Sequence, residues 1–574
     1  MSMVLVRGTP ASPGAAIGPA WTRSIVEARP TGTPAEEIAR VIDGLNRAAA
    51  ELAGLVAALA ADGHAADAEI VDTNRMMATD RTLVDAAIRE AQAGLPAAEA
   101  IVRAVEPHAR ALDSLDDPML AARAADLRAV GRRAADLSLG LADDPPSGSI
   151  VVADDLGPGE VASWAGRIAA IVLAGGGTTA HAAIVARSLH VPLVTAAGEP
   201  ALAIPVGEPV GIDADRGLVW RRPDAAIRAR LESRMDQIRL QVAADQAERH
   251  QPAATTDGRL LRLLANAGTE AEVIAALDAG ADGIGLLRSE LAFLEARQWP
   301  TEQDHVQALE PLLRPLADRI ATVRTLDFGA DKTPPFLAEQ GVGGLLGARG
   351  IRLALAAEDG VDPQLRALLR VAGDTVLRIL VPMVTETAEV EAVRERAHRA
   401  RDLVAPGAPD PLVGAMIEVP AAALNARAIA KVSDFLSIGT NDLVQYTLAA
   451  DRQDPAVAGL AVAHHPAVIR LIARVVSAAH AAGIPVDVCG EAGGDAELLP
   501  LLVGLGVDEL SVSPSRLAAT RRMIRSISLQ RARIAATAAL DATTPDEVAA
   551  ISRAVIDEAS GEVLEQVRDR LERV

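Results

Sequence analysis

A glycine-rich turn followed by a histidine is the segment of this sequence with the clearest chemical potential. The turn covers residues 176–180, and His181 follows it directly. The apolar run 168–174 predicts a strand before the turn, and residues 182–189 predict a helix after it. His181 would then lie at a helix N-terminus, where free N–H groups and the helix dipole favour an anion. Such an imidazole is a candidate phosphoryl acceptor, although a capping or core histidine fits the pattern about equally well.

A second set of reactive residues lies in the C-terminal half. Glu418 and Asp442 are hard oxygen ligands suited to Mg²⁺. Cys489 precedes Gly490 and Glu491 and could exchange a proton. The arginines that could bind phosphate or carboxylate through two nitrogens are Arg288, Arg324, Arg349 and Arg452. Each of these residues has an ordinary structural interpretation when taken alone. Together they predict a site for a small polyanionic substrate.

Strands must position this second set, and the sequence predicts them from about residue 255 onward. Short β-type runs there alternate with amphipathic helices, and eight strand–helix repeats are what a closed (β/α)₈ TIM barrel requires. The polar residues follow the ends of the runs, which form the active-site face of such barrels. The eight runs are Leu260–Ala265, Gly283–Leu287, Ile320–Leu326, Leu377–Val384, Val413–Val419, Phe435–Ile438, Pro485–Cys489 and Glu509–Val512.

The N-terminal half reads as an α/β domain that a helical bundle interrupts. Residues 34–141 are rich in alanine and carry apolar residues at three- and four-residue spacing, which is typical of a bundle. β-type runs precede and follow this block. The expected multidomain α/β organisation is residues 1–24 with 142–222 as the α/β domain, 25–141 as the inserted helices, 223–253 as a linker helix, 254–530 as the barrel, and 531–574 as C-terminal helices.

Composition narrows the class of protein. The 574 residues suggest roughly three or four domains. A net charge of −21 disfavours nucleic acid and anionic membranes as partners. The single cysteine excludes an internal disulfide, and the N-terminus carries no signal-peptide core. No apolar stretch approaches the length of a membrane span. We therefore expect a cytoplasmic protein without membrane insertion, with cores of Ala, Val, Leu and Ile because aromatics make up only 2%.

Several of these segments, in order along the chain, resemble the Enzyme I family, the phosphoenolpyruvate-protein phosphotransferases of the bacterial phosphotransferase system. The most specific match is the segment Gly439–Leu448 continuing to Asp451 and Arg452. The segment around His181 is similar to the family's phosphohistidine motif. The other similar segments are 11–14, 285–290, 324–327 with Gly329, Asp331 and Lys332, 417–422 and 489–491. The resemblance covers about residues 5–560.

The resemblance implies a two-site phosphoryl relay. Phosphoenolpyruvate (PEP) and Mg²⁺ would bind on the barrel, His181 would take the phosphoryl group, and Cys489 would protonate the enolate to give pyruvate. Glu418 and Asp442 resemble the Mg²⁺ ligands, and Arg187 and Lys332 would support the reaction. The residues that resemble the substrate contacts are Arg288, Arg324, Arg349, Asn441, Asp442 and Arg452.

The resemblance also implies partners and a motion. The inserted helices would dock the histidine-containing phosphocarrier protein HPr, and the barrel would form a homodimer. His181 must meet both the barrel and the carrier, so the phosphohistidine domain would swivel about a hinge in Pro223–His250.

Some positions depart from the family pattern. Ala180 and Ala182 stand where hydroxyl residues often flank the histidine, and Ala348 stands where tryptophan usually precedes Arg349. In the helical block, residues 72–77 replace a more apolar, histidine-containing segment, while the region from Leu115-Asp116-Asp117 to Arg133 is similar to the family.

Two alternatives compete with this interpretation. A pyruvate phosphate dikinase or PEP synthase shares the phosphohistidine and barrel domains but adds a nucleotide-binding domain, and no glycine-rich nucleotide loop precedes the Ala-Ser-Pro-Gly segment here. A non-catalytic regulator that senses PEP would not need the histidine, both carboxylates, the thiol and all four arginines. We expect the phosphotransferase.

Overall fold

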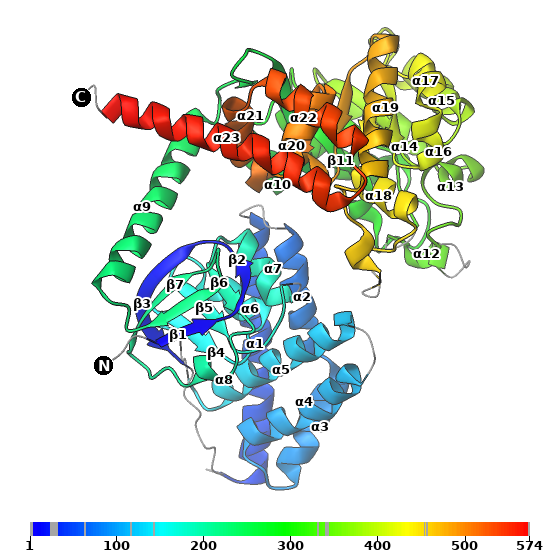
Figure 1. Cartoon of the computed structure of the whole chain (residues 1–574). Helices are drawn as coiled ribbons and strands as arrows, with labels where there is room; N and C mark the ends of the chain where they lie inside the picture. Colours follow the sequence, from blue (N-terminus) through cyan, green and yellow to red (C-terminus); the bar gives the residue numbers. More distant parts are fainter. Residues whose placement is uncertain are drawn as a thin grey trace. The chain divides into compact units, whose positions relative to one another are not determined.

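The computed structural model describes residues 4–22, 32–61, 65–114, 118–141, 144–178, 180–329, 332–338, 344–452, 454 and 457–571. Thr179 of the glycine-rich turn, Asp331 of the segment that follows Arg324, and Leu115-Asp116-Asp117 lie outside the described residues. The chain forms two compact units, Met1–Ala244 and Asp245–Val574 (Figure 1).

In the described part of the inserted block, five helices belong to the first unit. They are α1 (Pro34–Ala61), α2 (Ala65–Ala78), α3 (Arg81–Gln92), α4 (Ala97–Asp113) and α5 (Pro118–Ser138). Their apolar faces meet in a core that includes Val41 and Leu45 of α1, Ile101 of α4 and Leu137 of α5. The helical bundle predicted from the spacing of apolar residues is confirmed.

An eight-stranded sheet forms the rest of the first unit, in the order β1-β8-β7-β3-β4-β5-β6-β2. β3 precedes the helices and β4 follows them, yet the two pair in parallel, with Trp21 opposite Val151. The helical block therefore interrupts the sheet, as predicted. The strands are β1 (Val4–Arg7), β2 (Thr9–Ser12), β3 (Ala15–Trp21), β4 (Ile150–Ala153), β5 (Ala170–Leu173), β6 (Leu193–Thr195), β7 (Pro209–Asp213) and β8 (Leu218–Arg221).

Three short helices of the described residues connect these strands: α6 (Pro158–Trp164), α7 (His181–Ser188) and α8 (Glu199–Leu202). Of these, α6 and α7 pack against the inserted helices, whereas Ala201 of α8 packs against the sheet. One buried cluster joins Val71 of α2, Trp164 of α6 and Val185 of α7. Helix α9 (Ala225–Glu248) confirms the helix predicted for Pro223–His250, and the division between the units falls near its end.

The second unit contains a closed parallel barrel. Its strands are β10 (Leu260–Ala267), β11 (Gly283–Arg288), β12 (Ile320–Arg324), β13 (Val376–Val381), β14 (Leu412–Ile417), β15 (Leu436–Ile438), β16 (Val486–Val488) and β17 (Glu509–Val512). Each pairs in parallel with its neighbours, and β10 closes the ring by pairing with both β11 and β17. The short strand β9 (Ala253–Ala254) pairs antiparallel with β10. The predicted (β/α)₈ barrel is confirmed.

Helices surround the barrel and extend beyond it. They are α10 (Glu270–Asp278), α11 (Glu302–Leu313), α12 (Pro335–Ala338), α13 (Gly350–Ala356), α14 (Asp362–Val371), α15 (Thr387–Val404), α16 (Pro420–Leu424), α17 (Ala426–Ile429), α18 (Thr440–Leu448), α19 (Pro466–Ala482), α20 (Leu499–Leu505), α21 (Leu517–Ser526), α22 (Leu529–Asp541) and α23 (Pro545–Leu571). No helix of the described residues is long and apolar enough to cross a membrane.

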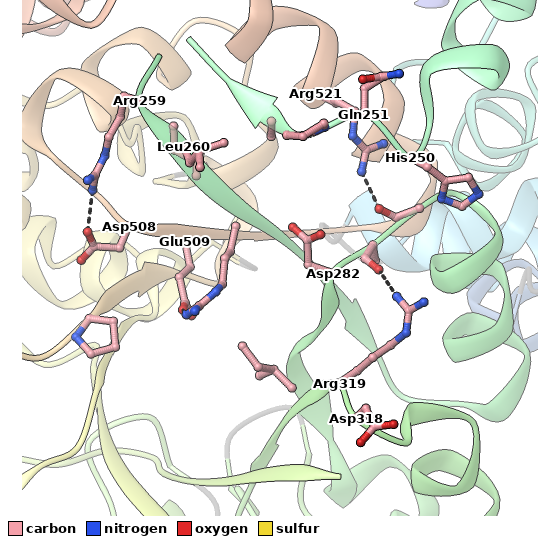
Figure 2. A pocket seen from close by; sticks show the side chains of 18 of the residues that line it. His250, Gln251, Arg259, Leu260, Asp282, Asp318, Arg319, Asp508, Glu509 and Arg521 are labelled. Carbon is pink, nitrogen blue, oxygen red and sulfur yellow. Dashed lines mark hydrogen bonds and ion pairs between the residues drawn. The ribbon is translucent and has the colours of Figure 1, made fainter. Parts of the chain in front are cut away.

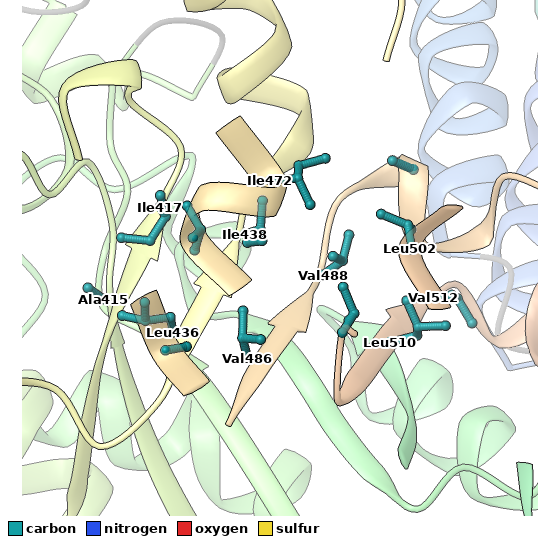
Figure 3. Close-up of a cluster of buried hydrophobic side chains, with 14 of the residues drawn as sticks. Ala415, Ile417, Leu436, Ile438, Ile472, Val486, Val488, Leu502, Leu510 and Val512 are labelled. Carbon is teal, nitrogen blue, oxygen red and sulfur yellow. The ribbon is translucent and has the colours of Figure 1, made fainter. Parts of the chain in front are cut away.

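Side chains alternate along each barrel strand between the helix-facing layer and the interior. In β16, Val486 and Val488 join the outer apolar cluster with Ile472 of α19 and Leu502 of α20 (Figure 3). The residues between and after them, Asp487 and Cys489, therefore face the interior. The outer layer consists of Val, Leu, Ile and Ala, as expected from the low aromatic content.

Several predicted strands extend beyond the carboxyl ends of the observed strands. The run predicted to end at Val384 ends at Val381, and the run predicted to end at Val419 ends at Ile417. Apolar sequence continues there, but the backbone leaves the hydrogen-bonded ladder. Met383, for example, has a φ of 57°. These departures turn the residues that follow each strand toward the mouth of the barrel.

Candidate active site

The histidine predicted to accept a phosphoryl group begins helix α7, immediately after β5 and the glycine-rich turn. Gly176 has a φ of 76°, a backbone conformation that favours glycine. Ala180 occupies the N-cap position and has no side-chain oxygen to cap the helix. The first N–H groups of α7 thus lack a side-chain cap, as an anion site requires.

Arg187, at the other end of α7, ties this turn to the sheet. Its Nη1 atom donates to the carbonyl of Ala11 at 2.7 Å and to the carbonyl of Thr178 at 2.9 Å. Burial lowers the pKa of Arg187 from its usual value. The supporting role of Arg187 in the reaction stays a prediction, and its two hydrogen bonds make it a brace for the turn.

A cavity of about 390 Å³ opens at the carboxyl ends of the barrel strands. Eight of the residues singled out in the sequence line it together: Arg288, Arg324, Lys332, Glu418, Asn441, Asp442, Arg452 and Cys489. They are spread along the sequence from Arg288 to Cys489 and converge because parallel strands end on one face. Arg349 is not part of this lining.

Arg349 lies behind the cavity and organises its wall. Its side chain is 4% exposed and precedes α13. Nη1 donates to Asp442 at 3.0 Å and to the hydroxyl of Tyr446 at 3.1 Å, while Nη2 pairs with Asp327 at 3.1 Å. Burial lowers the pKa of Arg349, but Asp327, Asp442 and Glu418 outweigh that effect and raise it overall. These contacts orient the guanidinium, although the preceding residue, Ala348, offers only a small side chain.

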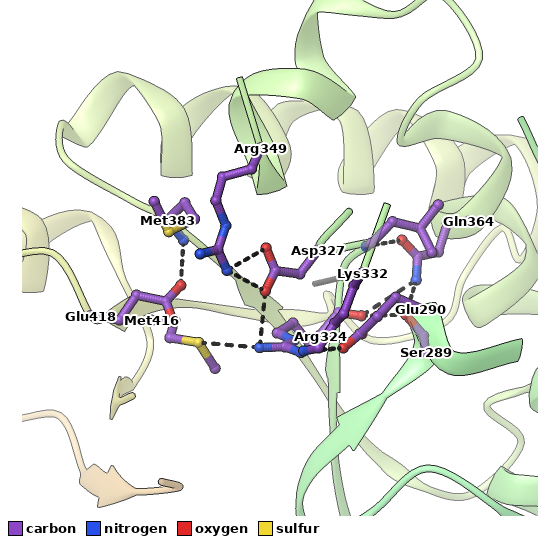
Figure 4. Close-up of polar contacts among 11 residues, drawn as sticks. Ser289, Glu290, Arg324, Asp327, Lys332, Arg349, Gln364, Met383, Met416 and Glu418 are labelled. Atoms are coloured by element: carbon purple, nitrogen blue, oxygen red, sulfur yellow. Dashed lines mark hydrogen bonds and ion pairs between the residues drawn. The ribbon is translucent and has the colours of Figure 1, made fainter. Parts of the chain in front are cut away.

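Asp327 joins Arg349 to Arg324, the last residue of β12 (Figure 4). It is fully buried and lies 3.3 Å from Nη1 of Arg324. Arg324 also pairs with Glu290, which receives Nζ of Lys332 at 3.1 Å. Burial raises the pKa of Glu290, but Arg324 and Lys332 reverse this effect and hold it at about 2. Glu290 is therefore ionised and anchors both cations at the cavity wall.

Glu418 and Asp442 lie in the acidic part of the wall, to which Glu272 and Glu491 also belong. Burial foremost, then Asp442 and Asp327, raise the pKa of Glu418 to about 8. Its Oε1 atom accepts a hydrogen bond from the Met383 backbone at 2.6 Å. A Cβ atom at Gly439 would come within 3.0 Å of Oε2 of Glu418, so glycine keeps space beside this carboxylate.

These two carboxylates fit a divalent cation that takes further oxygens from water or substrate. Both line the same cavity, and the charge of Asp442 makes ionisation of Glu418 less favourable. A divalent cation would offset this repulsion between the two carboxylates. Among the described residues no cluster of three or more His, Cys, Asp or Glu side chains could hold a metal by itself.

Asn441 of α18 and Cys489, the residue after β16, both line the cavity. Oδ1 of Asn441 accepts from the Glu491 backbone N–H at 3.0 Å, which connects the two segments. The thiol of Cys489 is buried, and its Sγ atom lies 3.7 Å from the Ile438 carbonyl. Burial first, and then Asp487, raise the pKa of this thiol. Cys489 is consequently protonated at neutral pH and lines the cavity as a potential acid.

The sequence analysis missed several residues of this site. Asn266 follows the run assigned to the first barrel strand, and its Nδ2 atom donates to the Cys489 carbonyl at 3.0 Å. Its position as a polar residue at a strand end could have identified it. Gln364 of α14 donates to Ser289 at 2.8 Å and accepts from the Leu326 backbone. No local pattern marks Gln364, because it reaches the site only through the folded barrel.

A larger cavity, of about 1130 Å³, lies at the opposite, amino-terminal ends of the strands (Figure 2). Its charged side chains form ion pairs and hydrogen bonds that connect the segments at this end of the barrel. Arg259 pairs with Asp508 at 2.6 Å, and Arg319 donates to the Ala281 carbonyl at 2.8 Å. Polar groups at this face of a barrel serve stability, so the chemistry belongs to the carboxyl-end cavity.

Comparisons with known proteins agree with this geometry. Residues 242–529 match the PEP-utilising enzymes in their PEP-binding domain, residues 7–123 in their N-terminal domain and residues 145–217 in their mobile domain. The phosphoenolpyruvate-protein phosphotransferase of Staphylococcus carnosus is 32% identical over 559 residues, which cover 95% of this chain and 97% of that protein.

Two other relatives are longer than this chain. The multiphosphoryl transfer protein of Xanthomonas campestris pv. campestris is 37% identical over 564 residues, covering 95% of this chain and 66% of that protein. The protein of the same name from Rhodobacter capsulatus is 38% identical over 454 residues, covering 78% and 54%. The chain thus spans two thirds or less of both. With three PEP-utilising segments in order and nearly the whole length of the Staphylococcus protein matched, the chain belongs to the family of phosphoenolpyruvate-protein phosphotransferases.

Proposed function

We propose that this chain transfers the phosphoryl group of PEP to its own His181 and from there to a histidine-containing carrier protein. The observation that carries this proposal is the barrel cavity. It combines cationic side chains for a phosphate and a carboxylate, two carboxylates for a cation, and a protonated thiol. PEP needs this combination, because it carries a phosphate, a carboxylate and an enol carbon that must gain a proton.

The cations bind the two anionic groups of the substrate. Arg288, Arg324, Arg452 and Lys332 line the cavity, and guanidinium groups bind phosphate and carboxylate oxygens bidentately. Arg349 acts indirectly by holding Asp442 and Asp327. Fixed charges of this kind stabilise the charge that develops on a transferring phosphoryl group without reorganising during the reaction.

Glu418 and Asp442 would hold Mg²⁺, and Asn441 would contact the substrate beside it. When bound, the cation withdraws charge from the phosphate oxygens. Burial and its acidic neighbours raise the pKa of Glu418 to about 8, and the positive charge of a bound cation would favour its ionised form.

The phosphoryl transfer and the protonation are separate steps. A ring nitrogen of His181 forms a bond to phosphorus as the bond to the enol oxygen breaks, and the enolate leaves with that electron pair. The S–H proton of Cys489 then passes to the methylene carbon, which gives pyruvate and a thiolate. The raised pKa of Cys489 keeps this proton in place until the enolate forms.

Three further features stay predictions from the resemblance. They are HPr as the carrier docked by the inserted helices, a homodimer through the barrel, and a cytoplasmic location. The proposal does not depend on the pathway that the carrier serves.

The test is phosphorylation of the full chain by PEP labelled in its phosphate, with Mg²⁺ and no nucleotide. We expect an acid-labile phosphoryl group that His181→Gln abolishes. His190→Asn is the matched control, because His190 lies nearby, is exposed, and has a φ of 56°, which asparagine tolerates. Absence of label in the wild-type chain would overturn the proposal. A requirement for ATP would instead indicate a dikinase.

A further inference from the structure

Two further polar side chains lie in the barrel interior beneath Cys489. Asp487 comes two residues before Cys489 in β16, and Ser437 of β15 is the register partner of Asp487. Because side chains alternate along a strand, all three share the inner face. They are 4%, 0% and 2% exposed for Asp487, Ser437 and Cys489. The residues that alternate with them belong to the outer apolar layer (Figure 3): Leu436, Ile438, Val486 and Val488.

The hydroxyl of Ser437 interacts with both the carboxyl group and the thiol. Burial first, then Glu509, raise the pKa of Asp487 to about 8, and the Ser437 hydroxyl lowers it. Burial first, then Asp487, raise the pKa of Cys489, and the same hydroxyl lowers it. Residues two apart in a strand are separated by about 6.6 Å, which is longer than a hydrogen bond. Ser437 therefore lies where it can connect Asp487 to Cys489.

The fold does not use the hydrogen-bonding capacity of this pair fully. Oγ of Ser437 and Oδ2 of Asp487 are buried atoms without a well-aligned hydrogen-bond partner among the described residues. Buried polar atoms are normally paired, so two such atoms on facing residues call for an explanation. A serine hydroxyl donates once and accepts twice, so its oxygen can take up one proton while it gives another away. Cys489 itself packs in an apolar cluster with Leu286, Leu380, Met416 and Phe435.

On its other side, Asp487 faces a charged group that reaches the opposite end of the barrel. Glu509 of β17 is the register partner of Asp487 on that side. It pairs with Arg378 at 2.6 Å and with Arg262 at 2.7 Å. Glu509 and Arg262 line the cavity at the amino-terminal ends of the strands. Polar side chains thus extend through the interior from that cavity to the thiol.

We propose that Asp487 and Ser437 form a proton relay that restores the thiol of Cys489 after each turnover. Once the enolate has taken the S–H proton, the thiolate takes the hydroxyl proton of Ser437, and the Ser437 oxygen takes the carboxyl proton of Asp487. The thiol and the hydroxyl are then neutral, and Asp487 is left as a carboxylate. It regains a proton from solvent on the side of Glu509. This inference rests on the proposed function, because that function produces the thiolate.

The test compares two exchange reactions of the full chain in ²H₂O with PEP, pyruvate and Mg²⁺. Exchange of ¹⁴C from pyruvate into PEP requires Cys489 to give a proton and take one back, but none from solvent. Deuterium enters the pyruvate methyl group only if the hydrogen on Cys489 has exchanged with solvent. For the wild type we expect close to one deuterium per carbon exchange event.

Asp487→Asn and Ser437→Ala interrupt the relay at its two members. Both should incorporate roughly tenfold less deuterium per carbon exchange event, because the hydrogen taken from one pyruvate returns to the next. Carbon exchange itself should continue in both variants. Thr322→Val is the matched control. It removes a buried hydroxyl from the inner face of β12, which lies across the barrel from β16, and should keep the wild-type ratio.

The outcomes separate this inference from the proposed function. A wild-type ratio of deuterium to carbon exchange in Asp487→Asn or in Ser437→Ala would overturn the relay while carbon exchange still supports the proposed function. Equal losses of the two exchanges would also overturn it, because these residues would then act only on the structure. Absence of carbon exchange in the wild type would overturn the proposed function and the relay together.

Discussion

Buried arginines and carboxylates at the carboxyl ends of the barrel strands compensate one another residue by residue. Asp327 binds Arg324 and Arg349, and Glu290 binds Arg324 and Lys332. Removing one partner of such a pair leaves an uncompensated buried charge, which costs about 3–5 kcal/mol. The positions of the cations are therefore set by the fold.

Cys489→Ala separates the two chemical steps of the proposed reaction. Alanine lacks the S–H proton, so pyruvate formation should fall by roughly 10²–10⁴-fold, the usual contribution of a general acid. Phosphoryl exchange between the phosphorylated chain and an acceptor protein should stay within a few-fold of wild type. Rapid-quench measurement of pyruvate and of label at His181 follows the two steps.

Cys489→Ser is the informative companion of that variant, because it keeps a proton donor of similar size with a higher pKa. We expect intermediate pyruvate formation. An equal loss of both steps in Cys489→Ala would contradict the role of the thiol as proton donor.

Asp487 carries a buried carboxyl group whose proton also affects stability. Burial foremost, then Glu509, raise its pKa from 3.8 to about 8. Between these two values the folded chain keeps a proton that the unfolded chain releases. The stability that this group contributes is thus greatest below pH 3.8, falls as the pH rises, and levels off above about pH 8.

Asp487→Asn should remove that pH dependence and raise the free energy of unfolding at pH 8 by several kcal/mol. Denaturant unfolding from pH 5 to pH 9 measures the slope. Asp318→Asn is the control, because Asp318 is exposed and its φ of 62° suits asparagine. A variant that keeps the wild-type slope would show that another group titrates in this window.

At the scale of the elements, the loop after β12 decides where Arg349 stands. Gly329 has a φ of 125°, and a Cβ atom there would lie 2.4 Å from Cβ of Arg349. The backbone of Gly350 donates to the Phe328 carbonyl at 3.0 Å, so the two segments are held together. A side chain at position 329 can be accommodated only if Arg349 moves.

Gly329→Ala should therefore lower kcat/KM for PEP by about tenfold or more, since Arg349 would lose its alignment with Asp327 and Asp442. Steady-state pyruvate formation with the full chain measures this. Gly258→Ala is the matched control: Gly258 has a φ of 89°, but a Cβ atom there would meet no other atom within 4 Å. Both variants should lose about 1 kcal/mol of stability from backbone strain, and only the first should lose activity. Equal activities would contradict the steric argument.

The elements themselves were largely predictable, and their contacts were not. All eight barrel strands could be predicted from apolar runs in the sequence. A strand that is covered on both faces consists mostly of apolar residues, and such a run can be recognised without the structure. Strand ends were predicted less well, since Val384 and Val419 remain apolar after the backbone has left the ladder. Pairings such as His181 with Asp126, or Gln364 with Ser289, depend on how distant elements pack, and no spacing in the sequence encodes them.

At the scale of the whole molecule, each of the main buried hydrophobic clusters lies within one of the two units. The clusters around Val41, Val151 and Val172 lie in the first unit, and those around Leu263 and Leu286 lie in the second. Separate cores give separate cooperative transitions.

Calorimetry of the full chain should therefore show two transitions. PEP with Mg²⁺ should raise only the transition of the barrel unit, because its cavity lies wholly in that unit. At a ligand concentration of about 100 times Kd the stabilisation is about 2.7 kcal/mol. The variant Arg324→Ala assigns the transitions, because it should abolish the ligand-induced rise of the barrel transition. One transition that shifts as a whole would mean that the two units unfold together.

The aromatic packing around Trp299 provides an optical reporter. Of the four tryptophans in the sequence, only Trp299 belongs to the barrel unit. Its ring centroid lies 5.8 Å from that of Phe328, the residue directly after Asp327. With Trp21, Trp164 and Trp220 replaced by phenylalanine, the remaining emission would come from the wall that supports the arginines. Titration with phosphate-bearing ligands could then be followed by fluorescence, without turnover and without an added dye.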